Sequence, residues 1–236
     1  MRRRRAIAGI VGALVLALPT TALANSLDSS STSKFVAATS GAVRAELAGQ
    51  GKLEAAVNAL ISHVQSGCPG AVPASLKTGT AAQQRTAEAL SFEAEAELTL
   101  ALIDPVRSAE QRAIRVIAPL RWTSATLNGE VSAFVRQGRA ALALHPPDIC
   151  AQAKAAAVSG FAVVPPATTT FLRHYGAALP SSAPTAIDLA DKMKPLADAQ
   201  GRVAIGQLAS LEGRVSHALG HFTFSALDRL SRALSS

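Results

Sequence analysis

Small and branched apolar residues recur every three or four positions through most of the chain, which is the repeat of an amphipathic α-helix. Segments with this repeat span residues 34–66, 81–103, 105–118, 125–145, 149–159, 166–175, 186–199 and 204–236. No segment alternates apolar and polar residues for long enough to predict a β-strand. The sequence therefore predicts an all-α fold, a multi-helix bundle of seven to nine helices, with residues 34–236 as a single helical domain.

Glycine and capping residues mark the expected helix boundaries. Gly49-Gln50-Gly51 is a break that leaves residues 34–66 as either one long helix or two short ones. Thr123 or Ser124 is expected to cap one helix and Asp148 another, because their side-chain oxygens can accept hydrogen bonds from the first free N–H groups.

The N-terminus has the three parts of a secretory signal peptide. Arg2 to Arg5 form a cationic head, residues 6–18 are small and apolar, and Ala22-Leu23-Ala24 fits a small-x-small cleavage site. We predict cleavage after Ala24, so that residues 1–24 are a signal peptide and the mature chain is secreted or otherwise extracytoplasmic. An uncleaved membrane anchor is the alternative, although residues 6–18 are fewer than the roughly 20 that span a bilayer. Both the general secretory route and the twin-arginine route remain open.

Residues 25–33 are rich in serine and lack a helical repeat, so we predict a disordered spacer there. The whole chain carries a net charge of +7, but without residues 1–24 it holds 19 basic and 16 acidic side chains, which leaves +3. A charge this small predicts no nucleic-acid partner for an exported protein. The mature chain is also expected to have no transmembrane segment, because its apolar runs are interrupted by charged residues.

Cys68 and Cys150 are the two cysteines of the chain. An even number of cysteines in an exported protein favours a disulfide, and two cysteines allow one intramolecular pairing. Neither belongs to a Cys-x-x-Cys unit, so their spacing gives little support to a redox or zinc site.

The chain lacks the common signatures of nucleotide-binding and hydrolytic enzymes, including the phosphate-binding loop, the nucleophile elbow and the His-Glu-x-x-His zinc motif. A di-iron site is not predicted, because no histidine follows a glutamate by three positions. Glu88, Glu93, Glu95 and Glu97 fall on several faces of one predicted helix and are expected to lie in solvent. The sequence thus favours a protein without catalytic residues, enzymatic activity or a bound cofactor.

Two pairs of residues are the candidates for ligand binding. His217 and His221 share a helix face and suit a transition metal, or they are exposed neighbours of an apolar stripe with no third ligand. His174 precedes Tyr175, the single tyrosine of the chain, and in this pair the tyrosine suits an axial ligand of haem that the neighbouring histidine can tune. The alternative for Tyr175 is packing at a helix end with its hydroxyl in water.

Several motifs lie outside the apolar stripes and follow one another in a fixed order. They are His63-Val64-Gln65-Ser66-Gly67-Cys68-Pro69-Gly70, Leu120-Arg121-Trp122 and Pro147-Asp148-Ile149-Cys150. With this pattern the chain resembles, from about Ser62 to Tyr175, a family of uncharacterised secreted all-helical actinobacterial proteins. The resemblance implies export, a helical fold and a Cys68–Cys150 bridge, and it implies nothing about catalysis.

The sequence as a whole favours an exported helical protein that binds or scaffolds a component of the cell envelope or the extracellular space. A small-ligand carrier is the second hypothesis, with haem, a metal or an apolar molecule held between helices by residues such as His174, Tyr175, His217 and His221. An enzyme with an unrecognised site is the third.

Overall fold

The computed structural model of the chain describes residues 20–68, 78–179 and 184–235. The helices are α1 (Thr20–Ala48), α2 (Gln50–Gly67), α3 (Ala81–Ile103), α4 (Arg107–Ile117), α5 (Ala125–Leu142), α6 (Ile149–Val158), α7 (Pro166–Ala178), α8 (Ala186–Met193) and α9 (Ala199–Ser235), with short 3-10 turns η1 (Asp104–Val106) and η2 (Lys194–Leu196). These residues contain no strand, so the predicted all-α fold of seven to nine helices is confirmed. None of the described helices combines the length and the apolar character that a bilayer span requires.

Local sequence signals set several of these boundaries. Ser124 Oγ accepts a hydrogen bond from the N–H of Leu127 at the start of α5, and Asp148 Oδ1 accepts one from Ala151 in α6. Gly49 separates α1 from α2, so the chain forms two helices there instead of one long helix. A Cβ atom at Gly49 would lie 3.0 Å from the Ala45 carbonyl oxygen, which explains why a glycine suits this close turn.

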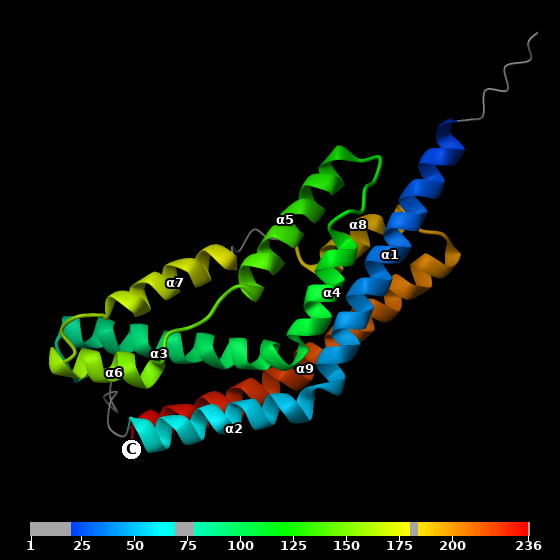
Figure 1. Ribbon diagram of the computed structural model, residues 1–236. Helices are drawn as coiled ribbons and strands as arrows, with labels where there is room; N and C mark the ends of the chain where they lie inside the picture. Colours follow the sequence, from blue (N-terminus) through cyan, green and yellow to red (C-terminus); the bar gives the residue numbers. More distant parts are fainter. Residues whose placement is uncertain (1–19, 69–77, 180–183, 236) are drawn as a thin grey trace, which may run out of the picture.

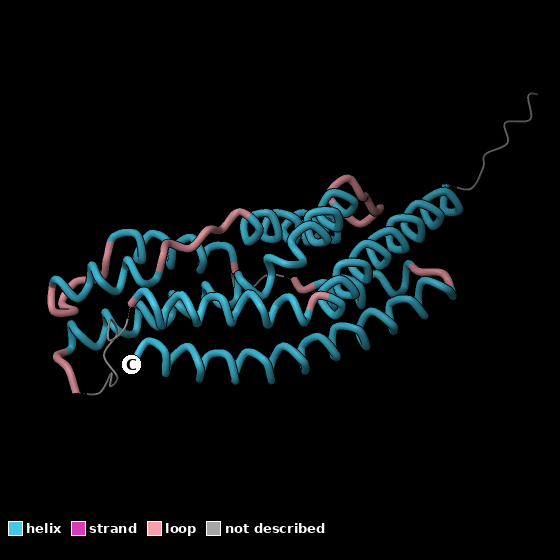
Figure 2. Tube along the Cα trace, turned by 60° about the horizontal axis from the view of Figure 1, so that its bottom comes forward, coloured by secondary structure: helices cyan, strands magenta, loops and turns pink. Residues whose placement is uncertain are grey.

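Three long helices set the shape of the molecule (Figures 1 and 2). α1 and α2 lie one after the other, and the 37-residue α9 packs along both of them. At 1.5 Å per residue, α9 is about 55 Å long. α4, α5 and α8 gather at the end of the bundle that holds α1, whereas α3, α6 and α7 gather at the end that holds α2. α9 thus connects the two ends.

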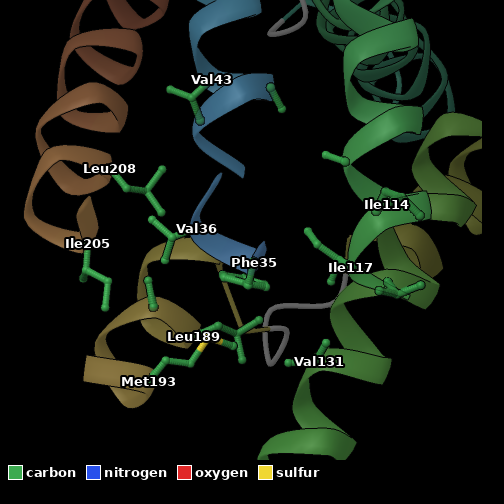
Figure 3. Packing of buried hydrophobic residues seen from close by; sticks show 14 of the residues in the cluster. Phe35, Val36, Val43, Ile114, Ile117, Val131, Leu189, Met193, Ile205 and Leu208 are labelled. Atoms are coloured by element: carbon green, nitrogen blue, oxygen red, sulfur yellow. The ribbon is translucent and has the colours of Figure 1, made fainter. Parts of the chain in front are cut away.

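The larger hydrophobic core lies between α1, α4, α5, α8 and the first half of α9 (Figure 3). Figure 3 labels Phe35, Val36, Val43, Ile114, Ile117, Val131, Leu189, Met193, Ile205 and Leu208 within it. The fully buried Phe35 ring lies 6.4 Å from the Trp122 ring and 6.0 Å from the Phe134 ring, between centroids. Burying each side chain of this size contributes about 1.5–3 kcal/mol. This core therefore fixes how the helices around α1 are placed.

A second hydrophobic core joins α2, α3, α6 and the last part of α9, and it contains the disulfide. Cys68, directly after α2, is bonded to Cys150 in the first turn of α6, with 5.1 Å between the Cα atoms. The predicted disulfide is confirmed. It ties the C-terminal end of α2 to the N-terminal end of α6.

The prediction of a disordered spacer at residues 25–33 is wrong, because these residues are helical and belong to α1. Their polar side chains pack against the loop before α5. Asp28 accepts hydrogen bonds from the N–H and the hydroxyl of Thr123, at 2.7 and 2.6 Å, and Ser31 donates one to the carbonyl of Arg121. The serine-rich segment therefore forms a polar helix face whose side chains hydrogen-bond with the loop before α5. Most of the predicted signal peptide, residues 1–19, lies outside the described residues.

Candidate functional site

A cavity of about 350 Å³ lies between α1, α4 and α9, next to the larger core. Its apolar wall includes Val43, Ile114 and Ile117, which are labelled in Figure 3. Three glutamates also line the cavity, one from each of these helices: Glu46 from α1, Glu110 from α4 and Glu212 from α9, and Phe134 of α5 and Ala186 of α8 also contribute to its lining. The volume falls in the range of small-molecule sites. We call this space with its three carboxyl groups the acidic cavity.

The carboxyl groups of the acidic cavity disfavour one another's negative charge. Burial, followed by a hydrogen bond and the charge of Glu110, raises the pKa of Glu46 to about 8. Burial and the charges of Glu110 and Asp188 also raise the pKa of Glu212. A cation in the cavity would favour the ionised carboxylates and lower these pKa values. The arrangement is therefore suited to binding a positively charged group.

Apolar side chains and hydroxyl groups also line the acidic cavity, and they determine which further contacts it can make with a ligand. Phe134 and Val215 extend the apolar lining beside the glutamates, so a ligand with an apolar part would lose contact with water on binding. The Thr39 hydroxyl on the wall donates a hydrogen bond to the carbonyl of Phe35 within α1, which occupies its proton. The lining thus offers carboxylates, the Ser216 hydroxyl and apolar contacts to a ligand.

Glu46, Glu110 and Glu212 are not among the site residues that the sequence predicts. A weak signal exists, because each lies three positions from a buried apolar residue on its own helix: Val43 before Glu46, Ala113 after Glu110 and Val215 after Glu212. A carboxylate on the buried stripe of a helix is costly unless it has a role or a partner. The convergence of three such residues depends on the packing of three helices and is not visible in the chain order.

A second polar cluster surrounds the disulfide. His63 on α2 and Asp148 at the start of α6 lie 3.3 Å apart, from Nε2 to Oδ2, and both side chains are half exposed. The nearest ligand-type atoms of His63, Asp148 and Cys150 all lie within 4.8 Å of one another. A hydrogen bond from the N–H of Ala151 is the largest influence that lowers the pKa of Asp148, and His63 adds to it. We call this group, together with Cys68, the disulfide cluster.

The expectation that the glutamates of α3 lie in solvent is wrong for two of them. Glu93 is fully buried, and its carboxyl group lies beside the buried Thr168 hydroxyl without a hydrogen bond of good geometry between them. Burial, followed by the charge of Glu93, raises the pKa of Glu97 to about 8. α3 is covered by α2, α6 and α7 on several sides, so its faces cannot all reach water. Burial also raises the pKa of Glu93, so the surroundings of both carboxyl groups disfavour their charged forms.

His217 and His221 are exposed on α9, with ring centroids 4.8 Å apart. They share a helix face, as the spacing predicts. Within the described part of the chain, no third histidine, cysteine or carboxylate joins them in a group with metal-ligand spacing. The structure therefore adds no ligand to this pair.

His174 and Tyr175 point to different surroundings on α7. The Tyr175 ring is half-buried, 5.8 Å from the Phe171 ring and 6.0 Å from the Phe92 ring, and its hydroxyl lies within hydrogen-bonding reach of Thr99. His174 is exposed and borders a second cavity, of about 510 Å³, together with His145. The structure does not direct the two side chains to one common ligand position.

Comparison with known protein families, with curated proteins and with solved structures finds no match to this chain.

Proposed function

We propose that this protein is an exported, non-enzymatic binding protein whose acidic cavity takes a small organic cation with an apolar part. The observation that carries the proposal is the convergence of Glu46, Glu110 and Glu212 on one apolar-walled cavity. It develops the second sequence hypothesis, a small-ligand carrier between helices, and it places the ligand away from the histidine candidates. Its location would be the cell envelope or the extracellular space.

The chemistry of the lining favours an organic cation over a bare metal ion. A metal ion needs several ligand atoms at close range, and the three glutamates do not form a group with metal-ligand spacing. An alkylammonium group needs one or two carboxylates, and its apolar part would cover surface such as Ile114 and Phe134. Such a molecule uses both kinds of lining at once.

Octylammonium is the probe for this proposal, and octanol is its uncharged counterpart. We expect octylammonium to bind at least tenfold more tightly than octanol, a difference of about 1.4 kcal/mol or more. Its affinity should rise with pH up to about 8 and then level off, because the cation favours the ionised form of Glu46, whose pKa is raised to about 8. Isothermal titration calorimetry across this pH range measures both effects.

The matched variants are Glu46→Gln in the cavity and Glu54→Gln on an exposed part of α2. Glu46→Gln should weaken octylammonium binding at least about tenfold and remove most of its pH dependence. It should keep the fold, because glutamine resembles the protonated form that burial already favours. Equal binding of octanol and octylammonium, or equal affinity of the two variants, would reject the acidic cavity as the site.

Export is tested separately from ligand binding. The N-terminal pattern supports cleavage after Ala24, which would leave Asn25 and Ser26, two good helix-capping residues, at the start of the remaining α1. We expect to find the mature protein in the extracytoplasmic fraction. Its mass should equal that of a chain that begins at Asn25 and contains one disulfide bond. Intact-mass measurement after fractionation checks this, and a full-length chain retained in the cytosol would contradict it.

A further inference from the structure

The disulfide cluster brings together four side chains that are common zinc ligands. His63 lies one turn before the end of α2, and Cys68 follows that helix. Asp148 caps α6, and Cys150 lies in its first turn. The ligand atoms of His63, Asp148 and Cys150 lie within 4.8 Å of one another, and Cys68 Sγ is bonded to Cys150 Sγ. The four atoms thus occupy one small volume at the junction of two helices.

These separations are close to those of a tetrahedral zinc site. Zn–S bonds of about 2.3 Å and Zn–N or Zn–O bonds of about 2.0–2.2 Å place neighbouring ligand atoms roughly 3.3–3.8 Å apart. His63 Nε2 and Asp148 Oδ2 already lie 3.3 Å apart. The other gaps among His63, Asp148 and Cys150, of at most 4.8 Å, need to close by about 1 Å, which side-chain rotation can supply. Once their bond is reduced, the sulfur atoms of Cys68 and Cys150 need to move apart to about 3.8 Å.

We propose that the dithiol form of this protein binds one Zn²⁺ ion through His63, Cys68, Asp148 and Cys150. The disulfide and the zinc site are then alternative states of the same cluster. This inference does not depend on the acidic cavity, because the two groups of residues lie on different elements and in different parts of the bundle.

The change between the two states balances chemically. A phosphine reductant breaks the Cys68–Cys150 bond, a water molecule supplies the phosphine oxide oxygen, and its two protons complete the two thiols. Zn²⁺ then displaces one proton from each thiol and binds two thiolates.

The surrounding structure can hold this site without unfolding the helices. Asp148 Oδ1 accepts the capping hydrogen bond from Ala151, which leaves Oδ2, the atom facing His63, free to bind the metal. The side chains of His63 and Asp148 are each 52% exposed, so an ion can reach the cluster from solvent. Both cysteines are nearly fully buried behind them.

The test uses the full mature chain after reduction with a water-soluble phosphine and anaerobic removal of the reductant. The reduced chain is then titrated with Zn²⁺ in competition with a chromophoric chelator. We expect one Zn²⁺ per reduced chain and no comparable binding by the oxidised chain. Co²⁺ should give a thiolate-to-metal charge-transfer band and the intense d–d bands of a four-coordinate site. Zinc should also raise the unfolding temperature of the reduced chain.

His63→Gln and Asp148→Asn are the variants, and each can be checked for folding in its oxidised form before reduction. Asparagine still caps α6, so Asp148→Asn removes the anionic ligand and keeps the helix start. Each variant should weaken zinc binding at least about tenfold, while His217→Gln/His221→Gln, the matched control on α9, should leave it unchanged. The proposal is overturned if the reduced chain takes up no zinc, or if His63→Gln and Asp148→Asn bind it as tightly as the original protein.

Discussion

Replacing Trp122 with alanine is expected to lower the free energy of unfolding by about 3–5 kcal/mol. The indole is buried, its Nε1–H donates to the Thr32 hydroxyl at 3.1 Å, and its ring makes a T-shaped contact with the Phe35 ring. The truncation would open a cavity in the larger core and leave the buried Thr32 hydroxyl without this donor. Urea unfolding followed by circular dichroism measures the loss.

Two further variants separate packing from hydrogen bonding at this position. Trp122→Phe keeps an aromatic ring but removes the donor to Thr32, so it should cost less than Trp122→Ala. Phe224, an aromatic side chain that is 79% exposed on α9, is the control, and Phe224→Ala should change stability by no more than about 0.5 kcal/mol. A loss of stability below about 1 kcal/mol for Trp122→Ala would contradict this prediction. It would mean that the first half of α1 does not pack against the loop before α5, which is the result expected if residues 25–33 were a disordered spacer.

The Cys68→Ser/Cys150→Ser double variant is expected to lose about 4 kcal/mol of stability in the absence of zinc. The two cysteines are 82 positions apart, so their bond restricts a long loop of the unfolded chain. The lost bond also frees the end of α2 from the start of α6 within the second core. Urea unfolding of oxidised protein and double variant gives the difference.

Reduction of the original protein without metal provides an independent check on that value. It should lower the stability by a similar amount, and addition of Zn²⁺ should restore part of the loss only where His63 and Asp148 are present. If the double variant unfolds at the same urea concentration as the oxidised protein, the bond contributes nothing to the fold.

The helix pattern could be predicted because its causes are local. Gly49 ends α1, Ser124 caps α5, and Asp148 caps α6, and each acts within four residues of its own position. The disulfide followed from the number of cysteines, since two allow a single pairing. Neither inference requires knowledge of how the helices pack.

Residues 25–33 show where local composition misled. A serine-rich stretch without an apolar repeat is typical of a mobile spacer. Asp28, Ser31 and Thr32 instead find partners at residues 121–123, about 90 positions further along the chain. Hydrogen-bond partners so distant in sequence leave no trace in the segment itself.

Sequence alone determined that this chain is all-α, where several of its helices begin and end, and which cysteines pair. Only the tertiary structure decided which polar side chains meet: Glu46, Glu110 and Glu212 around one cavity, and His63 and Asp148 beside the disulfide. The physical reason is the distance along the chain over which each interaction acts. Capping and helical periodicity act over three or four residues, whereas a binding site depends on the relative placement of helices, which the packing of the whole core sets.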